Sequence, residues 1–137
     1  MSKLAIEKIL SPNDTGETGG HQAGILVPKE SEILAFFPKL DPSVKNPRVV
    51  LDMHDDTGGE WTFCFIYYNN RFFGGTRNEY RLTGMTAFFR EFNLKAGDKI
   101  ILRHESSRSL HISYKRSQEQ GKVLKLSLTW KVVIGDF

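Results

Sequence analysis

Short runs in which apolar and polar residues alternate recur along the chain and predict a protein built mainly from β-strands. The clearest runs are residues 48–54 (RVVLDMH), 60–68 (EWTFCFIYY) and 78–83 (NEYRLT). Their alternation and their β-branched and aromatic residues are typical of strands. A hairpin turn around Gly58 is expected between the first two runs. Further strands are expected within residues 4–10, 23–27, 99–102, 110–117 and 123–133.

Two segments repeat apolar residues at helical spacing instead. Residues 28–38 (PKESEILAFFP) begin with a proline suited to the first turn of a helix, and they predict a short amphipathic helix. Thr86 is expected to cap a second short helix, whose phenylalanines share one face. Because the chain has seven or eight predicted strands and no βαβ alternation, a closed or nearly closed barrel is expected. The two helices would cap the barrel ends.

Length and composition narrow the class of protein. With 137 residues, of which 39% are apolar and 26% charged, residues 1–137 are expected to form a single domain. No apolar run approaches the roughly 20 residues of a membrane helix, so no membrane partner is expected. The lone Cys64 excludes an internal disulfide and favours a reducing, cytoplasmic location. A net charge of +3 permits a nucleic-acid partner without requiring one.

The motifs of common enzymes are missing from the chain. The string GETGGH lacks the Gly-Lys-Ser/Thr ending of a P-loop, and there is no HExxH, CxxC or EF-hand pattern. None of the 16 acidic residues precedes a lysine by two positions, the offset found in common metal-dependent nucleases. Cys64 lies in a strand-like run and is interpreted as a strand residue rather than a nucleophile. The sequence therefore predicts no catalytic residue, no metal site and no cofactor in this chain.

Two other classes of protein stay open as alternatives. A small metal-dependent nuclease would use carboxylates and imidazole that gather at one strand end and turn, namely Asp52, His54, Asp55, Asp56 and Glu60. Solvated acidic residues are common at such turns. A single-strand or RNA-binding barrel would stack bases on Trp61, Phe63, Phe65 and Trp130. The alternating strand positions of these aromatic residues favour core packing.

Two loops carry an unusual set of residues. Residues 13–24 (NDTGETGGHQAG) and 69–81 (NNRFFGGTRNEYR) combine glycines, amides and planar charged side chains. Arginine can bind the guanine edge, glutamate can accept from cytosine, and asparagine can pair with adenine. Glycines allow backbone N–H groups to approach phosphates closely. Both loops are therefore candidate nucleic-acid-binding elements, and glycine-rich turns with solvated charges are the plainer alternative.

Three segments carry a resemblance to known families. Residues 13–24 and 66–83 resemble the two signature segments of the N-terminal effector domain of the restriction endonuclease EcoRII, in the same order and with a similar separation. Residues 84–102 (GMTAFFREFNLKAGDKIIL) are similar to the corresponding part of plant B3 transcription-factor domains. The resemblance covers most of the chain and is weakest after about Ser106. It implies a seven-stranded DNA-binding pseudobarrel with two short helices.

The resemblance also implies how the domain works. An N-terminal arm (residues 11–22) and a C-terminal arm (residues 71–81) would grip the major groove of double-stranded DNA at a short G·C-rich site related to CC(A/T)GG. The chain would be the non-catalytic effector or targeting domain of a type II restriction endonuclease, covalently linked to a nuclease domain; a free-standing binder is equally compatible. The implied DNA contacts are Asn13, Asp14, Thr15, Thr18, His21, Gln22, Arg71, Arg77, Asn78, Glu79, Tyr80 and Arg81.

Two features refine this expectation. Glu79 and Arg81 lie two positions apart on one face of a predicted strand, so we expect them to read neighbouring bases. Where the EcoRII segment carries lysines, this chain has Gly75 and Tyr80. Two cationic contacts are therefore missing, which puts a direct transfer of the EcoRII target in question.

Overall fold

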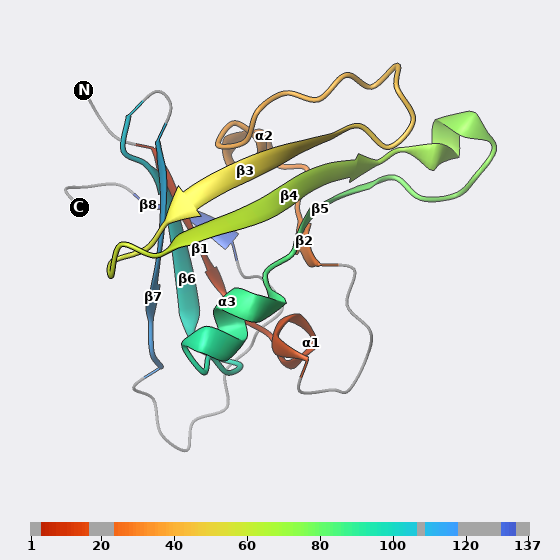
Figure 1. Cartoon of the computed structure of the whole chain (residues 1–137). Helices are drawn as coiled ribbons and strands as arrows, with labels where there is room; N and C mark the ends of the chain where they lie inside the picture. The colour runs from red at the N-terminus through yellow and green to blue at the C-terminus, as the bar shows by residue number, and fades with distance from the viewer. Residues whose placement is uncertain (1–3, 17–23, 107–108, 118–129, 134–137) are drawn as a thin grey trace.

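The computed structural model describes residues 4–16, 24–106, 109–117 and 130–133, and these form a curled β-sheet with short helices (Figure 1). The sheet has eight strands in the order β2-β5-β4-β3-β7-β6-β1-β8. The strands are β1 (Ala5–Ile9), β2 (Ile25–Val27), β3 (Arg48–His54), β4 (Glu60–Tyr68), β5 (Glu79–Thr83), β6 (Lys99–His104), β7 (Leu110–Lys115) and β8 (Trp130–Val133). The helices are α1 (Pro12–Thr15), α2 (Ser31–Leu34) and α3 (Thr86–Glu91), with a 3-10 turn, η1 (Asn70–Phe73).

The sheet curls into a nearly closed barrel. All strand pairs are antiparallel except β3 and β7, which pair in parallel over only two positions, Met53 with Leu110 and His54 with His111. The end strands β2 and β8 contact one another. The indole Nε1 of Trp130 in β8 donates a hydrogen bond to the carbonyl oxygen of Leu26 in β2 at 2.9 Å. This contact joins the two open edges of the sheet. The predicted mainly β, nearly closed barrel is confirmed.

Two long strands follow the sequence pattern closely. The runs 48–54 and 60–68 form β3 and β4 with the predicted bounds, paired from Arg48 opposite Ile66 to His54 opposite Glu60. The turn between them closes where the backbone N–H of Asp55 donates to the carbonyl oxygen of Gly59 at 2.9 Å. Since successive side chains alternate between faces, the hydrophobic residues of one face enter the core.

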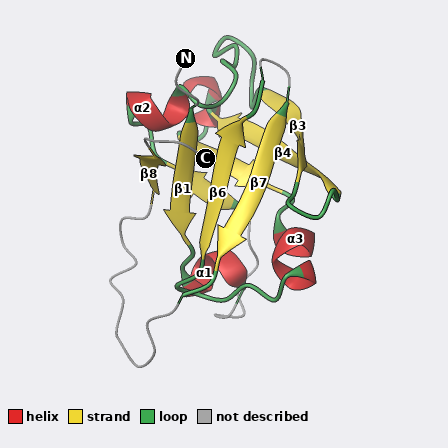
Figure 2. Cartoon of the chain, turned by 90° about the vertical axis from the view of Figure 1, so that its left-hand side faces the viewer, coloured by secondary structure: helices red, strands yellow, loops and turns green. Residues whose placement is uncertain are grey.

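Helices close the two ends of the barrel around an aromatic core. Figure 2 shows α2 at one end, and α1 and α3 at the other. The ring of Phe88 in α3 meets the ring of Trp61 edge-on, with 5.2 Å between their centroids. Below α2, Phe37 stacks on Phe65 at 4.2 Å. Phe63 and Phe65 are each only 1% exposed, so their predicted place in the core is confirmed.

The segment expected to form one helix over residues 28–38 is helical only over α2. After Leu34 the chain turns, and Phe36 and Phe37 are both buried, 2% and 4% exposed. Consecutive residues do not share a face of a helix, so the turn is what brings both rings into the core. The expected helix was too long because burial of both rings overrides the helical spacing.

The start of α3 also differs from expectation. Thr86 is the first helical residue rather than the cap, and Met85 holds the cap position without a side-chain hydrogen bond. Met85 is 3% exposed, so its burial in the core fixes the start of the helix. Within the described ranges, no helix is long and apolar enough to cross a membrane.

A short helix stands where the sequence indicated only a loop. In α1, the backbone N–H of Asp14 donates to Ser11 Oγ at 3.1 Å, and the backbone N–H of Ser11 donates to Asp14 Oδ2 at 2.9 Å. This reciprocal pair is a capping box, and Pro12 suits the first turn. The string Ser-Pro-Asn-Asp contains the capping-box pattern of a helix start. The glycines that follow this string favoured the prediction of a loop instead.

Candidate nucleic-acid interface

A hairpin extends β4 and β5 beyond the barrel and carries η1 at its tip (Figure 1). The backbone N–H of Arg71 donates to the carbonyl oxygen of Arg77 at 2.9 Å, so the two sides of the hairpin are bonded to each other. The side chain of Asn70 accepts from the backbone N–H of Arg77 at 2.7 Å. A Cβ at Gly75 would lie 2.8 Å from Asn70 Cγ, so no larger residue fits this turn unless Asn70 moves.

The base of the hairpin is anchored by Asn69, a residue that the sequence analysis did not single out. Asn69 is fully buried, and its amide Nδ2 donates to the carbonyl oxygens of Pro42 and Val44 at 3.1 and 2.8 Å. Its Oδ1 accepts from the backbone N–H of Asn46 at 2.7 Å. Both donors of this buried amide side chain, and its oxygen as an acceptor, therefore serve to fix residues 42–46 against the hairpin.

A row of three charged side chains follows the β5 side of the hairpin. Glu79 Oε1 accepts from Nε and Nη2 of Arg77 at 3.0 and 2.7 Å, and Glu79 Oε2 accepts from Nη2 of Arg81 at 3.2 Å. The Arg77 guanidinium also lies over the ring of Tyr68, 3.8 Å from its centroid. Because the carboxylate bonds both arginines, Glu79 and Arg81 share one face of the strand, as predicted.

Electrostatics keep this row charged and ordered. Burial alone would raise the pKa of Glu79, but the hydrogen bonds and positive charges of Arg77 and Arg81 hold that pKa below its usual value. The side chains of Arg77, Glu79 and Arg81 are 38%, 27% and 20% exposed. The row is thus preorganised and still open to solvent.

Asn78 and Tyr80 alternate with this row along the strand. The Tyr67 hydroxyl donates to Asn78 Oδ1 at 2.6 Å. The ring of Tyr80 stacks on Tyr67 at 4.2 Å and on Phe65 at 5.6 Å. Burial, followed by the neighbouring Tyr67, raises the pKa of the Tyr80 phenol. Tyr80 therefore supports the strand from the face opposite Glu79.

The described part of the N-terminal arm is α1 and its flanks. Asp14 Oδ2 accepts from Lys8 Nζ at 2.6 Å, and these side chains are only 9% and 6% exposed. Asn13 is exposed, and the hydroxyl of Thr15 donates to backbone oxygens of Ser11 and Pro12 at 3.4 and 3.3 Å. The predicted contacts Thr18, His21 and Gln22 lie outside the described residues.

Gly24, the first described residue after the N-terminal arm, contacts the charged row at the start of β2. Arg81 Nη1 donates to the carbonyl oxygen of Gly24 at 2.8 Å. Gly24 has φ +95°, and a Cβ there would come within 2.5 Å of the carbonyl oxygen of Leu82. Only glycine combines this backbone conformation with so close an approach to β5. The structure therefore joins the end of the N-terminal loop directly to the charged row.

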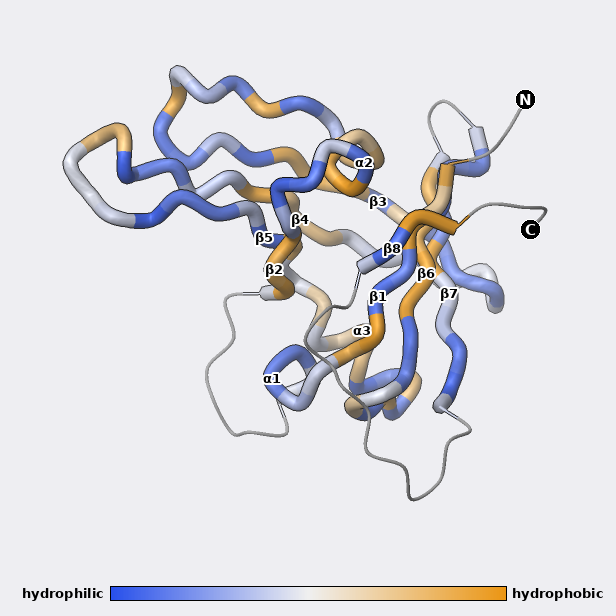
Figure 3. The backbone as a smooth tube through the Cα atoms, turned by 180° about the vertical axis from the view of Figure 1, so that it is seen from behind, coloured by the Kyte–Doolittle hydropathy of each residue, from blue (hydrophilic) through white to orange (hydrophobic). Residues whose placement is uncertain are grey.

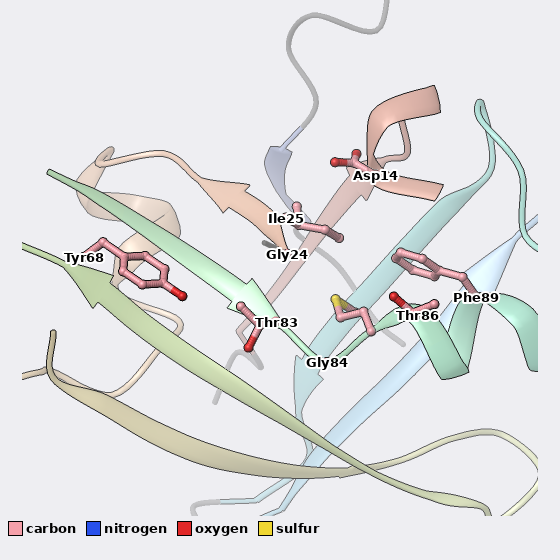
Figure 4. Close-up of a pocket in the computed structure, with 9 residues that line it drawn as sticks. Asp14, Gly24, Ile25, Tyr68, Thr83, Gly84, Thr86 and Phe89 are labelled. Carbon is pink, nitrogen blue, oxygen red and sulfur yellow. The ribbon is translucent and has the colours of Figure 1, made fainter. Parts of the chain in front are cut away.

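A depression of about 270 Å³ lies between α1, the start of β2 and the end of β5 (Figure 4). It is lined by residues of α1, β2, β4, β5 and α3, among them Asp14, Ile25, Tyr68, Thr83 and Phe89. Segments that are far apart in the sequence thus surround one concave surface beside the charged row.

Comparison with known proteins identifies the family. Residues 2–113 match the family described as restriction endonuclease EcoRII, N-terminal. The chain belongs to this family. The chain is 45% identical over 83 residues to the type II restriction enzyme EcoRII of Escherichia coli, a match that spans 56% of this chain and 19% of that protein. The matched range, residues 2–113, includes both segments that resemble this family, residues 13–24 and 66–83.

Plant proteins are similar in sequence to this EcoRII N-terminal family member. Auxin response factor 10 of Oryza sativa subsp. indica is 30% identical over 111 residues, 81% of this chain and 14% of that protein. The B3 domain-containing transcription factor VAL3 of Arabidopsis thaliana is 33% identical over 113 residues, again 81% and 14%. The chain therefore spans less than a fifth of these relatives.

A solved structure supports the same fold. The Arabidopsis FUS3-DNA complex superposes with a TM-score of 0.64 at 22% sequence identity, covering 82% of this chain and 96% of that one. The B3-like pseudobarrel is the architecture of this chain.

In this member of the EcoRII N-terminal family, Asp52, His54 and Asp56, which the nuclease alternative would use, each bond to a different side chain. Asp52 accepts from the Thr62 hydroxyl at 2.8 Å, Asp56 pairs with His111 at 3.0 Å, and His54 pairs with Glu105 at 2.5 Å. Among the residues that the structure describes, no group of three or more His, Cys, Asp or Glu side chains could hold a metal ion. Asp52 and Asp56 thus have structural partners.

Asp55, the most buried of these carboxylates, organises the β3–β4 turn. It is 6% exposed and accepts from the backbone N–H and hydroxyl of Thr57, the backbone N–H of Gly59 and the indole N–H of Trp61, all within 2.7–2.9 Å. Burial acts to raise its pKa, but these hydrogen bonds outweigh it and lower the pKa to about 2 from 3.8. The carboxylate is therefore a structural acceptor.

Replacing Asp55 by alanine is expected to destabilise the fold by about 2 kcal/mol at neutral pH, since hydrogen bonds to a charged acceptor are lost. The folded-state pKa is depressed, so this stabilisation is present above the unfolded pKa near 4 and is lost as pH falls through about 2. Urea unfolding at several pH values should show that the difference in the free energy of unfolding between wild type and Asp55→Ala becomes smaller in acid. Asp55→Asn is the matched control. A difference that does not change with pH would contradict the role of the Asp55 carboxylate as a charged acceptor.

Proposed function

We propose that this chain is a sequence-specific double-stranded DNA-binding domain, the effector or targeting module of a restriction endonuclease. The observation that carries the proposal is the preorganised row of Arg77, Glu79 and Arg81 beside the depression. Membership of the EcoRII N-terminal family supports it. So does the fold shared with a protein solved as a DNA complex.

The chemistry of the row suits the edges of base pairs in the major groove. An arginine guanidinium donates in a planar fork that matches O6 and N7 of guanine, and a carboxylate can accept from the cytosine amino group. Glu79 and Tyr68 already hold Arg77 in place. Less side-chain entropy is then lost on binding. We assign base reading to Arg77, Glu79 and Arg81.

The remaining predicted contacts would position the duplex. Arg71 at the hairpin tip is exposed and suits a phosphate. Asn78, Asn13 and Thr15, with Thr18, His21 and Gln22 of the N-terminal arm, complete the proposed contact set. The Asp14 carboxylate already bonds Lys8 and the backbone N–H of Ser11 in the capping box of α1. We therefore propose that Asp14 positions the N-terminal arm. Tyr80 supports the same face from behind.

The proposed target is a short G·C-rich site related to CC(A/T)GG. The loss of lysines at Gly75 and Tyr80 should weaken phosphate contacts more than base reading. The proposed partner within a full-length protein is a covalently linked nuclease domain, because the E. coli relative is a type II restriction enzyme of which this chain matches 19%. DNA binding by this chain requires no cofactor in this scheme, and its compartment would be the cytoplasm.

Equilibrium binding to labelled oligonucleotides tests the proposal. At near-physiological salt, a duplex containing CC(A/T)GG or a related G·C-rich site should bind the chain at least about 1000-fold more tightly than a scrambled duplex. The log of the binding constant should fall with log salt by about 0.9 per phosphate contact. Preference for single-stranded DNA or RNA would favour the stacking barrel. Magnesium-dependent cleavage of plasmid DNA that Asp52→Ala abolishes would favour the nuclease.

A further inference from the structure

The tip of the C-terminal arm presents an aromatic side chain to solvent. Phe72 is 65% exposed and its neighbour Phe73 is 43% exposed. Figure 3 shows this hydrophobic segment at the far end of the hairpin, next to hydrophilic positions. Exposing a large aromatic ring forfeits the free energy that its burial would provide, so the ring suits an apolar ligand group.

The backbone beneath Phe72 is fixed. Its N–H donates to the carbonyl oxygen of Asn69 at 3.0 Å, and Asn69 is itself fully buried. Gly75 N–H donates to the carbonyl oxygen of Asn70 at 2.7 Å, and Gly74 ends the turn at φ +91°. The backbone that carries the ring is therefore set before any ligand binds, which reduces the backbone entropy lost on contact.

A cation stands next to the exposed ring in the chain. Arg71 is exposed, and within the described part of the chain its guanidinium forms no ion pair with a carboxylate. The backbone of Arg71 is bonded to that of Arg77 across the hairpin, while the Arg77 side chain bonds Glu79 and covers the ring of Tyr68. An apolar ring beside an unpaired cation complements a polyanion that displays an apolar group in its groove. In the major groove of DNA, that group is the C5-methyl of thymine, which apolar side chains including Phe contact.

We propose that Phe72 packs against the C5-methyl group of a thymine at the edge of the site read by Arg77, Glu79 and Arg81. The inference rests on the proposed function and adds a specificity-determining residue to it. The target then contains an A·T pair on the side of the G·C-rich core that faces the hairpin tip. Removal of the methyl group from that one thymine should remove the contribution of Phe72.

The experiment pairs a protein change with a DNA change. The duplex selected by the wild-type chain from a randomised pool is resynthesised with each thymine replaced, one at a time, by uracil, which lacks only the methyl group. We expect one uracil substitution to weaken wild-type binding by about threefold to tenfold. Phe72→Ala should weaken binding of the thymine duplex by a similar factor, and should bind the thymine and uracil duplexes equally.

Control variants make the outcome specific. Phe72→Leu keeps an apolar group and should retain part of the preference for thymine, and Phe73→Ala should keep all of it. Equal wild-type affinity for every thymine and uracil pair would overturn the inference, as would a selected site without thymine. Dimerisation that Phe72→Ala abolishes, without a change in DNA affinity, would assign the ring to a second copy of the chain. Failure to select any duplex would instead count against the proposed function.

Discussion

Replacing Arg81 by alanine is expected to weaken binding of the selected duplex by roughly 5- to 150-fold, the cost of one bidentate base contact. Arg81 is held by the carbonyl oxygen of Gly24 at 2.8 Å and by Glu79 at 3.2 Å. Its guanidinium is therefore already oriented for the proposed contact with the duplex. The loss should be concentrated at one base position, so that duplexes altered there bind wild type and variant with similar affinity.

Two comparison variants separate base reading from charge. Arg81→Lys keeps the charge without the planar fork and should recover little of the affinity. Arg71→Ala should weaken all duplexes to a similar degree and lower the salt slope by about one. Urea unfolding of each variant shows whether the contact with Gly24 also matters for folding. If Arg81→Ala weakened the binding of all duplexes by the same factor, Arg81 would be assigned a phosphate contact instead of a base contact.

Replacing Asp14 by alanine is expected to destabilise the domain by about 3–5 kcal/mol, because it leaves the buried ammonium of Lys8 without a counter-charge. The two side chains are 9% and 6% exposed and lie 2.6 Å apart. The change also removes the capping box of α1. The prediction is checked by urea unfolding at neutral pH.

The double variant Lys8→Met/Asp14→Asn is the matched control. It removes both charges and retains an oxygen able to accept from the backbone N–H of Ser11. Most of the lost stability should return, because no unpaired charge is then buried. If the single variant loses less than about 1 kcal/mol, a value typical of exposed ion pairs, the pair does not anchor the arm.

The strands were predictable because each face of the barrel imposes a period of two on the sequence. In β3 and the first part of β4, alternate residues such as Leu51, Met53, Phe63 and Phe65 enter the core, and the intervening Val50, Asp52 and Thr62 are exposed. The same logic placed Glu79 and Arg81 together, and the structure confirms their shared face.

Features that depend on tertiary contacts could not be predicted from the sequence. Nothing in the string NNRFF indicates that Asn69 is fully buried and bonded to residues 42–46. Met85 takes the cap position expected for Thr86, and α3 begins at Thr86, because the burial of Met85 outweighs the capping preference. The pairing of Lys8 with Asp14 needs the turn of α1, which brings the acid back over β1.

The packing of Gly24 against β5 explains why the end of the N-terminal loop lies at the charged row. Any Cβ at this position would meet the carbonyl oxygen of Leu82, so the glycine has a structural purpose as well as belonging to the signature segment. One residue thus couples the entry of the chain into β2 to the placement of Arg81.

Selection from randomised duplex DNA by the wild-type chain and by Glu79→Ala, side by side at near-physiological salt, tests the central claim most directly. The account predicts a short, G·C-rich consensus for the wild type. Loss of Glu79 removes an acceptor and frees Arg77 and Arg81, so the variant should relax one or two adjacent positions at a cost of about 1–3 kcal/mol. An unchanged consensus for the variant, or no consensus for the wild type, would contradict base reading by this row.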